Sequence, residues 1–75
     1  PDTKYREEAY YLRLKSAYEL AKNSIESKKL QRFIESKTAY FDFIERYPEG
    51  ANVEDAVQMY VEIQDQIENL KKIQS

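Results

Sequence analysis

Apolar residues recur every three or four positions along most of the chain, which is the spacing of one face of an α-helix. In the first segment the series comprises Ala9, Leu12, Ala17, Leu20 and Ala21, with Tyr10, Leu14 and Tyr18 on an adjoining stripe. Thr3 can accept a hydrogen bond as the N-cap of this segment, and acidic residues follow in its early turns. The pattern predicts a helix that follows Thr3 and ends near residue 23.

A second helix is predicted from about residue 28 to residue 47. Its stripe is Phe33, Ser36, Tyr40, Phe43 and Tyr47, broadened by Ile34, Phe41 and Ile44. Pro48 cannot continue a helix and disfavours helical geometry at the residue before it, so the stripe ends there. Residues 23–31, "NSIESKKLQ", are mostly polar and indicate a loop or an extra helical turn.

A third helix is predicted to begin near Asn52, a favourable N-cap, with two acidic residues in its first turn. Its apolar positions are Val53, Ala56, Val57, Tyr60, Ile63, Ile67 and Leu70. Beyond Leu70 we expect the tail "KKIQS" to fray. With one Gly and two Pro in 75 residues, the chain favours long helices over a β-sandwich or barrel. The predicted fold class is therefore all-α with three helices.

The chain also repeats itself. "PDTKYREEAYYL" (1–12) aligns with "PEGANVEDAVQM" (48–59): proline matches proline, Glu-Glu-Ala matches Glu-Asp-Ala, and Leu12 matches Met59. The offset is 47 residues. A repeated turn followed by a repeated helix start is typical of helical-hairpin solenoids, in which each unit buries its apolar face on the next.

The first two helices resemble a tetratricopeptide repeat (TPR). Tyr11, Leu14 and Tyr18 match the large apolar positions of its first helix, and Ser36, Tyr40 and Pro48 match its second helix and closing proline. Lys15 stands where a Gly is usual, and Phe43 stands where a small residue is usual. The segment between the helices is about nine residues longer than the corresponding segment of a standard 34-residue TPR unit. The resemblance implies a TPR-like hairpin with a lengthened inter-helix segment (1–50), followed by a capping helix and frayed tail (51–75).

More specifically, residues 1–65 are similar to the C-terminal repeats of the lipoproteins that form the D subunit of the outer-membrane β-barrel assembly (Bam) complex. Those repeats read Ala-x3-Phe-x2-Phe/Ile-x3-Tyr-Pro, which here is Ser36, Tyr40, Phe43 and Tyr47-Pro48. The resemblance implies a periplasmic scaffold for other Bam subunits, anchored to the outer membrane only through a lipidated N-terminal Cys absent from this chain. The alternative is an unrelated TPR or three-helix module that binds a peptide or acts as a spacer.

Catalysis is not expected, because the chain has no His and no Cys for a nucleophile, an imidazole base or a transition-metal site. The acidic pairs Glu7-Glu8 and Glu54-Asp55 are interpreted as first-turn charges that stabilise helix dipoles. We therefore expect no catalytic residue, no cofactor and no metal. No apolar run is long enough for a transmembrane helix. The net charge of −2, with no Lys or Arg between Pro48 and Leu70, disfavours nucleic acid as a partner.

The aromatic residues raise the choice between helix packing and a binding surface. We expect Tyr18, Phe33, Tyr40 and Phe43 to pack between helices, while Tyr5, Tyr10, Phe41 and Tyr60 lie at flank or edge positions. Phe41, off the main stripe, is a candidate for an exposed contact. Tyr is enriched at protein interfaces, so edge positions remain open to either reading.

Candidate partner-binding residues fall into two further groups. The register of the TPR resemblance implies that Leu12, Ser16, Glu19 and Leu20 line the concave, ligand-binding face. The third helix carries an acidic face formed by Glu54, Glu62, Asp65 and Glu68, which is either solubilising charge or a docking surface for a basic partner. Asp65 stands in register with Tyr18 and so indicates a polar cap. We also expect the isolated fragment to self-associate through the exposed face of its first helix.

Overall fold

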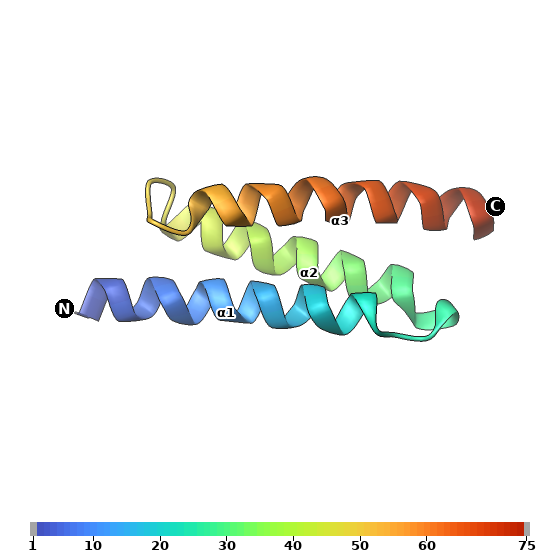
Figure 1. Ribbon diagram of the computed structural model, residues 1–75, viewed down its shortest axis with the longest axis horizontal. Helices are drawn as coiled ribbons and strands as arrows, with labels where there is room; N and C mark the ends of the chain where they lie inside the picture. Colours follow the sequence, from blue (N-terminus) through green and yellow to red (C-terminus); the bar gives the residue numbers. More distant parts are fainter. Residues whose placement is uncertain (1, 75) are drawn as a thin grey trace.

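Residues 2–74 form three α-helices, each antiparallel to the next along the chain: α1 (Asp2–Lys22), α2 (Glu26–Arg46) and α3 (Val53–Gln74). The computed structural model describes residues 2–74, with side-chain environments from residue 6 to residue 72. No strand occurs among residues 2–74, so the predicted all-α, three-helix fold is confirmed. Figure 1 shows α1 and α3 running in the same direction, with α2 behind and between them. The molecule is elongated, with extents of 46 × 17 × 15 Å.

The connection between α1 and α2 is short, and of the two predicted alternatives for residues 23–31 it agrees with an additional helical turn. It comprises only residues 23–25, and residues 26–31 are already helical. The prediction of a lengthened segment between these helices is therefore wrong, because the additional residues belong to the helices themselves. Side chains terminate α1, because Ser24 Oγ donates to the Leu20 carbonyl (2.7 Å) and Asn23 Nδ2 donates to the Glu19 carbonyl (2.9 Å). The Leu20 carbonyl gains a side-chain donor at the helix end, and the Glu19 carbonyl also accepts from the Asn23 N–H at 3.2 Å.

The connection between α2 and α3 agrees with the predicted proline boundary. α2 ends at Arg46, and the Tyr47 N–H still donates to the Phe43 carbonyl at 2.9 Å. The Asn52 carbonyl accepts the first α3 bond, from the Ala56 N–H at 3.0 Å, which confirms the predicted start. The Asn52 N–H itself donates to Glu7 Oε2 of α1 at 3.2 Å. This turn therefore fixes the beginning of α3 against the first turns of α1.

The two ends of the chain extend further as helix than predicted. α1 begins at Asp2, so the backbone of Thr3 lies inside the helix; the Thr3 and Tyr5 side chains lie outside the described residues. α3 continues to Gln74, so fraying directly after Leu70 is wrong for residues 71–74. Lys71 and Lys72 occupy its last turn, where cations stabilise the helix dipole. Pro1 and Ser75 lie outside the described residues.

The α1–α2 interface is an aromatic seam. Tyr11 packs on Phe43 with ring centroids 6.2 Å apart, and Tyr18 meets Phe33 edge-on at 6.5 Å. Tyr18, Phe33, Tyr40 and Phe43 are all buried, as predicted. The buried Ser36 donates its hydroxyl to the Phe33 carbonyl at 2.7 Å, so no polar atom is left unsatisfied there. Each fully buried side chain of this size contributes about 1.5–3 kcal/mol, so the seam dominates the stability of the hairpin.

The α2–α3 interface combines aliphatic packing with a tyrosine stack. The α3 residues buried here are Ala56, Ile63, Ile67 and Leu70. Tyr40 and Tyr60 stack with their ring centroids 4.3 Å apart and planes inclined by 17°. Phe41 meets Tyr60 edge-on at 5.6 Å and stays 43% exposed. Burial, followed by the charge of Tyr60, raises the pKa of the Tyr40 hydroxyl above its usual value.

Candidate functional site

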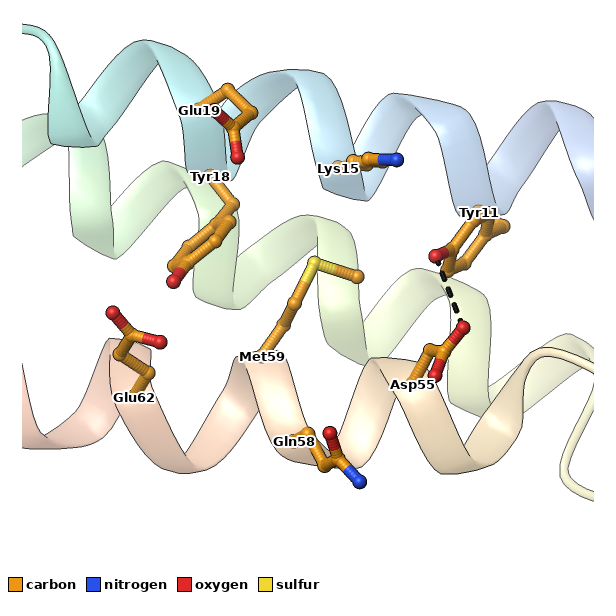
Figure 2. A pocket seen from close by; sticks show the side chains of 8 residues that line it. All are labelled: Tyr11, Lys15, Tyr18, Glu19, Asp55, Gln58, Met59 and Glu62. Atoms are coloured by element: carbon orange, nitrogen blue, oxygen red, sulfur yellow. Dashed lines mark hydrogen bonds between the residues drawn. The ribbon is translucent and has the colours of Figure 1, made fainter.

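A groove runs between α1 and α3, because these helices contact each other far less than either contacts α2. Its volume is about 260 Å³. The lining residues are Tyr11, Lys15, Tyr18 and Glu19 from α1, and Asp55, Gln58, Met59 and Glu62 from α3. Figure 2 shows Tyr11 reaching toward Asp55 and Tyr18 toward Glu62 across the gap, with α2 behind them. The α1–α3 groove is thus formed by two parallel helices held at a fixed distance by α2.

Tyr18 anchors one end of the groove. It is 7% exposed, its ring packs on Phe33, and the Lys22 ammonium lies 4.9 Å from its ring centroid. Its hydroxyl points across the groove toward the Glu62 carboxylate (Figure 2). Burial, and then interaction with Glu62, raises the pKa of the Tyr18 hydroxyl well above its usual range. At neutral pH this position therefore presents a neutral hydroxyl beside a carboxylate.

Tyr11 and Asp55 form a similar pair at the other end. The Tyr11 hydroxyl donates to Asp55 Oδ2 at 3.5 Å, the interaction drawn in Figure 2. Burial is the main cause of the raised pKa of Tyr11, and the Asp55 charge adds to it. The Tyr11–Asp55 bond bridges the two helices at this end of the groove, and at the other end the Tyr18 hydroxyl faces the Glu62 carboxylate.

The groove is acidic with an apolar floor. The carboxylates of Glu19, Asp55 and Glu62 line the groove together with the ammonium of Lys15, and Lys22 contacts Glu19 at 3.7 Å. Met59 lies between the two tyrosines. Carboxylates beside aromatic faces suit cationic groups, since the rings themselves attract a positive charge. Within residues 2–74 no group of three or more His, Cys, Asp or Glu side chains is placed to hold a metal ion. The arrangement can therefore bind a basic group.

The predicted partner-binding residues of α1 are divided by the structure. Glu19 lines the α1–α3 groove, whereas Leu12, Ser16 and Leu20 are exposed and are not among its lining residues. Leu12 borders a shallow cleft with Glu8, Tyr11 and Asn52. Of the four residues that the TPR register implies for the concave face, only Glu19 lines the groove.

The predicted residues of α3 and α2 are also dispersed. Glu62 lies in the groove, and Glu54 is exposed elsewhere on α3. Glu62, Asp65 and Glu68 all border a depression on the outer surface of α3. Phe41 is separate from all of these, at the outer edge of the α2–α3 interface.

Sequence reasoning did not identify the tyrosine–carboxylate pairs of the groove. Tyr18 was assigned to packing, Tyr11 to a large apolar position of the TPR resemblance, and Asp55 to the helix dipole. A signal was present, however: both pairs, Tyr11 with Asp55 and Tyr18 with Glu62, are separated by 44 residues. Parallel helices related by an internal repeat place such equally spaced residues opposite one another, so a tyrosine followed at that interval by a carboxylate marks contacts across the groove.

Two further observations bear on function. None of the helices within the described part of the chain has the length and apolar character needed to cross a membrane. Comparison with protein-family models, curated proteins and solved structures finds no match to this chain.

Proposed function

We propose that this chain is a non-catalytic protein–protein interaction unit of a helical-repeat scaffold. The observation that carries the proposal is the burial of equivalent positions in α1 and α3. Ala56, Ile63 and Ile67 of α3 are buried on α2. Their α1 equivalents, 47 residues earlier, are Ala9, Ser16 and Leu20, and all three are exposed. α3 thus packs these positions against a neighbouring helix, whereas α1 exposes the same positions to solvent.

Use of equivalent positions for contacts between neighbouring helices is typical of a stacked repeat. In a solenoid, each unit contacts its neighbours through the same positions, and the outer surfaces of the array are left for binding partners. The short turn between α1 and α2 and the Glu7–Asn52 bond fix the spacing of the helices. A rigid frame of this kind supports binding by presenting its surface in a preformed arrangement, so little ordering entropy is lost on association.

The finer proposal is a TPR-type scaffold at the periplasmic face of the outer membrane, similar to the D subunit of the Bam complex. The motif residues that support it include Leu14 and Tyr18, which pack under α2, and Tyr40 and Pro48 at the hairpin's end. Its partners would be other subunits of the barrel-assembly machinery. The α1–α3 groove is the contact surface we assign to them, because its acidic edges can select a basic segment.

Titration calorimetry of the purified chain against each purified barrel-assembly subunit tests this function. We expect saturable binding to at least one subunit, and the double substitution Asp55→Asn and Glu62→Gln to weaken it about tenfold or more, since both carboxylates line the groove. Glu26→Gln is the matched control, because Glu26 is an exposed carboxylate at the start of α2. Absence of binding to every subunit would contradict the barrel-assembly assignment.

The same acidic groove favours a second function, an independent module that binds basic peptides. In that case an unstructured Lys/Arg-rich peptide would bind the groove directly, with an affinity that falls as salt concentration rises. Binding of such a peptide without binding of any barrel-assembly subunit would favour this module.

A further inference from the structure

The outer face of α3 corresponds in the repeat to the face of α1 that packs against α2, but no helix of residues 2–74 covers it. On α1, Leu14 is 0% exposed beneath α2, and Tyr10 packs on Tyr47 with ring centroids 5.9 Å apart. The α3 equivalents of Leu14 and Tyr10 are Val61 and Val57, which are 64% and 41% exposed. The two valines therefore stand at positions that α2 covers on the first repeat.

The surroundings of these valines divide the surface into two halves. Toward the start of α3, Val57 is followed by Tyr60, whose ring contacts the exposed Phe41, so this half continues the apolar α2–α3 interface. Toward the end of α3, Asp65 and Glu68 replace the buried Tyr18 and Ala21 of the first repeat.

The acidic half also forms a depression of about 600 Å³, and Val61 lies within it. The other lining residues are Gln58, Glu62, Gln64, Asp65 and Glu68. The chain has no basic residue between Pro48 and Leu70, so none of the depression's own residues balances its carboxylates. A side chain that enters this depression therefore meets an apolar valine surrounded by negative charge.

We propose that the outer face of α3 binds an amphipathic helix of a partner protein that is basic in its N-terminal half and apolar in its C-terminal half. The inference rests on the proposed scaffold function and specifies one of its partners. Orientation follows from the first repeat, where α2 runs antiparallel to α1, with Tyr47 on Tyr10 and Phe33 on Tyr18. A helix with that orientation places its C-terminal half on Val57 and its N-terminal half on Asp65.

Two electrostatic effects act in the same direction. Basic side chains in the N-terminal half meet the carboxylates of Glu62, Asp65 and Glu68. The N-terminal end of a helix also carries a partial positive charge, which favours the acidic half of the surface. A helix bound in the opposite direction would place its apolar residues among the carboxylates and its basic residues on Phe41 and Val57.

The test uses two labelled 21-residue peptides, the length of α2, with identical composition and the same apolar stripe periodicity. One has its Lys and Arg residues in the N-terminal half, and the other has them in the C-terminal half. Fluorescence anisotropy with the intact 75-residue chain should show the first peptide binding about tenfold more tightly or better. Asp65→Asn with Glu68→Gln should remove most of that preference, and Val61→Asp should weaken both peptides.

Controls separate this inference from the proposed function. Ile25→Asp, a similar change at an exposed apolar residue in the turn before α2, should leave peptide binding unchanged. Equal affinity of the two peptides, or no binding by either, would overturn the inference. So would sedimentation of the chain as a dimer that Val61→Asp dissociates, because a second copy would then occupy the surface. Retained binding of a barrel-assembly subunit in the same preparation would show that the scaffold function survives such a failure.

Discussion

α1 and α3 carry related sequences 47 residues apart, but they bury opposite sides of the shared pattern. In α1 the buried residue is Leu14, and its equivalent Val61 in α3 is exposed. In α3 the buried residue is Ile63, and its equivalent Ser16 in α1 is exposed. The difference arises because α2 lies between the two helices and presents a different side to each (Figure 1). Burial in this fold is therefore decided by the neighbouring helix.

The largest expected effect tests the first half of this comparison. Leu14→Ala should lower the free energy of unfolding by about 2–5 kcal/mol, because it leaves a cavity in the seam. Val61→Ala, at the equivalent exposed position, should change it by no more than about 0.5 kcal/mol. Urea denaturation followed by circular dichroism measures both. Equal losses for the two variants would show that the repeats are not packed as described.

The turn that joins the repeats offers the next test. A Cβ at Gly50 would meet the carboxylate of Glu7, so Gly50→Ala should displace that side chain and break its bond to the Asn52 N–H. We expect a loss of about 1 kcal/mol in thermal denaturation, the net contribution of one such bond. Glu7→Gln, which keeps an acceptor oxygen, should cost less. A Gly50→Ala variant as stable as the parent would indicate that this bond does not hold α3 on α1.

The tyrosine pairs of the groove predict a pH effect. The folded-state pKa of Tyr18 lies above its unfolded value of about 10. The unfolded state therefore loses this proton first, so the stabilisation is complete below about pH 10 and declines as pH rises further. Tyr18→Phe should make unfolding free energies, measured in urea from pH 8 to about pH 11, fall less steeply above about pH 10.

Tyr11→Phe serves as the comparison within the same groove, because the pKa of Tyr11 is also raised but by less. It should alter the alkaline decline in the same direction and to a smaller extent. An identical pH profile for the parent and the Tyr18→Phe protein would contradict the raised pKa of the buried Tyr18 hydroxyl.

The smallest effect concerns a pair that α3 does not repeat. Arg13 of α1 contacts Asp42 of α2 at 3.3 Å, whereas its equivalent in α3 is Tyr60, which stacks on Tyr40. The Arg13–Asp42 pair is largely exposed, so a double-mutant cycle with Arg13→Ala and Asp42→Ala should yield about 0.2–1 kcal/mol. The coupling should shrink in high salt; a salt-independent value would point to packing as its source.

Much of the fold could be predicted because its signals are local. The 3–4 spacing in residues 33–47 identified the α2 stripe, and Pro48 identified its end. Residues 23–31 were left open between a loop and an extra helical turn because a polar helix start resembles a loop in sequence. Only the packing of the following turns distinguishes the two. The tail was underestimated for a related reason, since packing of Leu70 on the core supports the helix beyond it.

The candidate site was predicted less well, because it depends on which helices become neighbours. Glu19 and Glu62 were proposed as partner-binding residues, but only the parallel arrangement of α1 and α3 brings them to one groove with Tyr11 and Tyr18. Leu12 and Leu20, proposed for the same face, lie elsewhere, and their binding role stays a prediction.

The sequence by itself determined three helices, their aromatic packing stripe and the repeat at Pro48, because helix periodicity and proline geometry are properties of neighbouring residues. The tertiary structure decided which side of each repeat is covered. α2 can bury Leu14 of one helix and Ile63 of the other only by lying between them, and that placement leaves Val61 exposed and opens the groove between Tyr18 and Glu62. Exposure of an apolar position is settled by the helix that packs beside it, which local spacing does not specify.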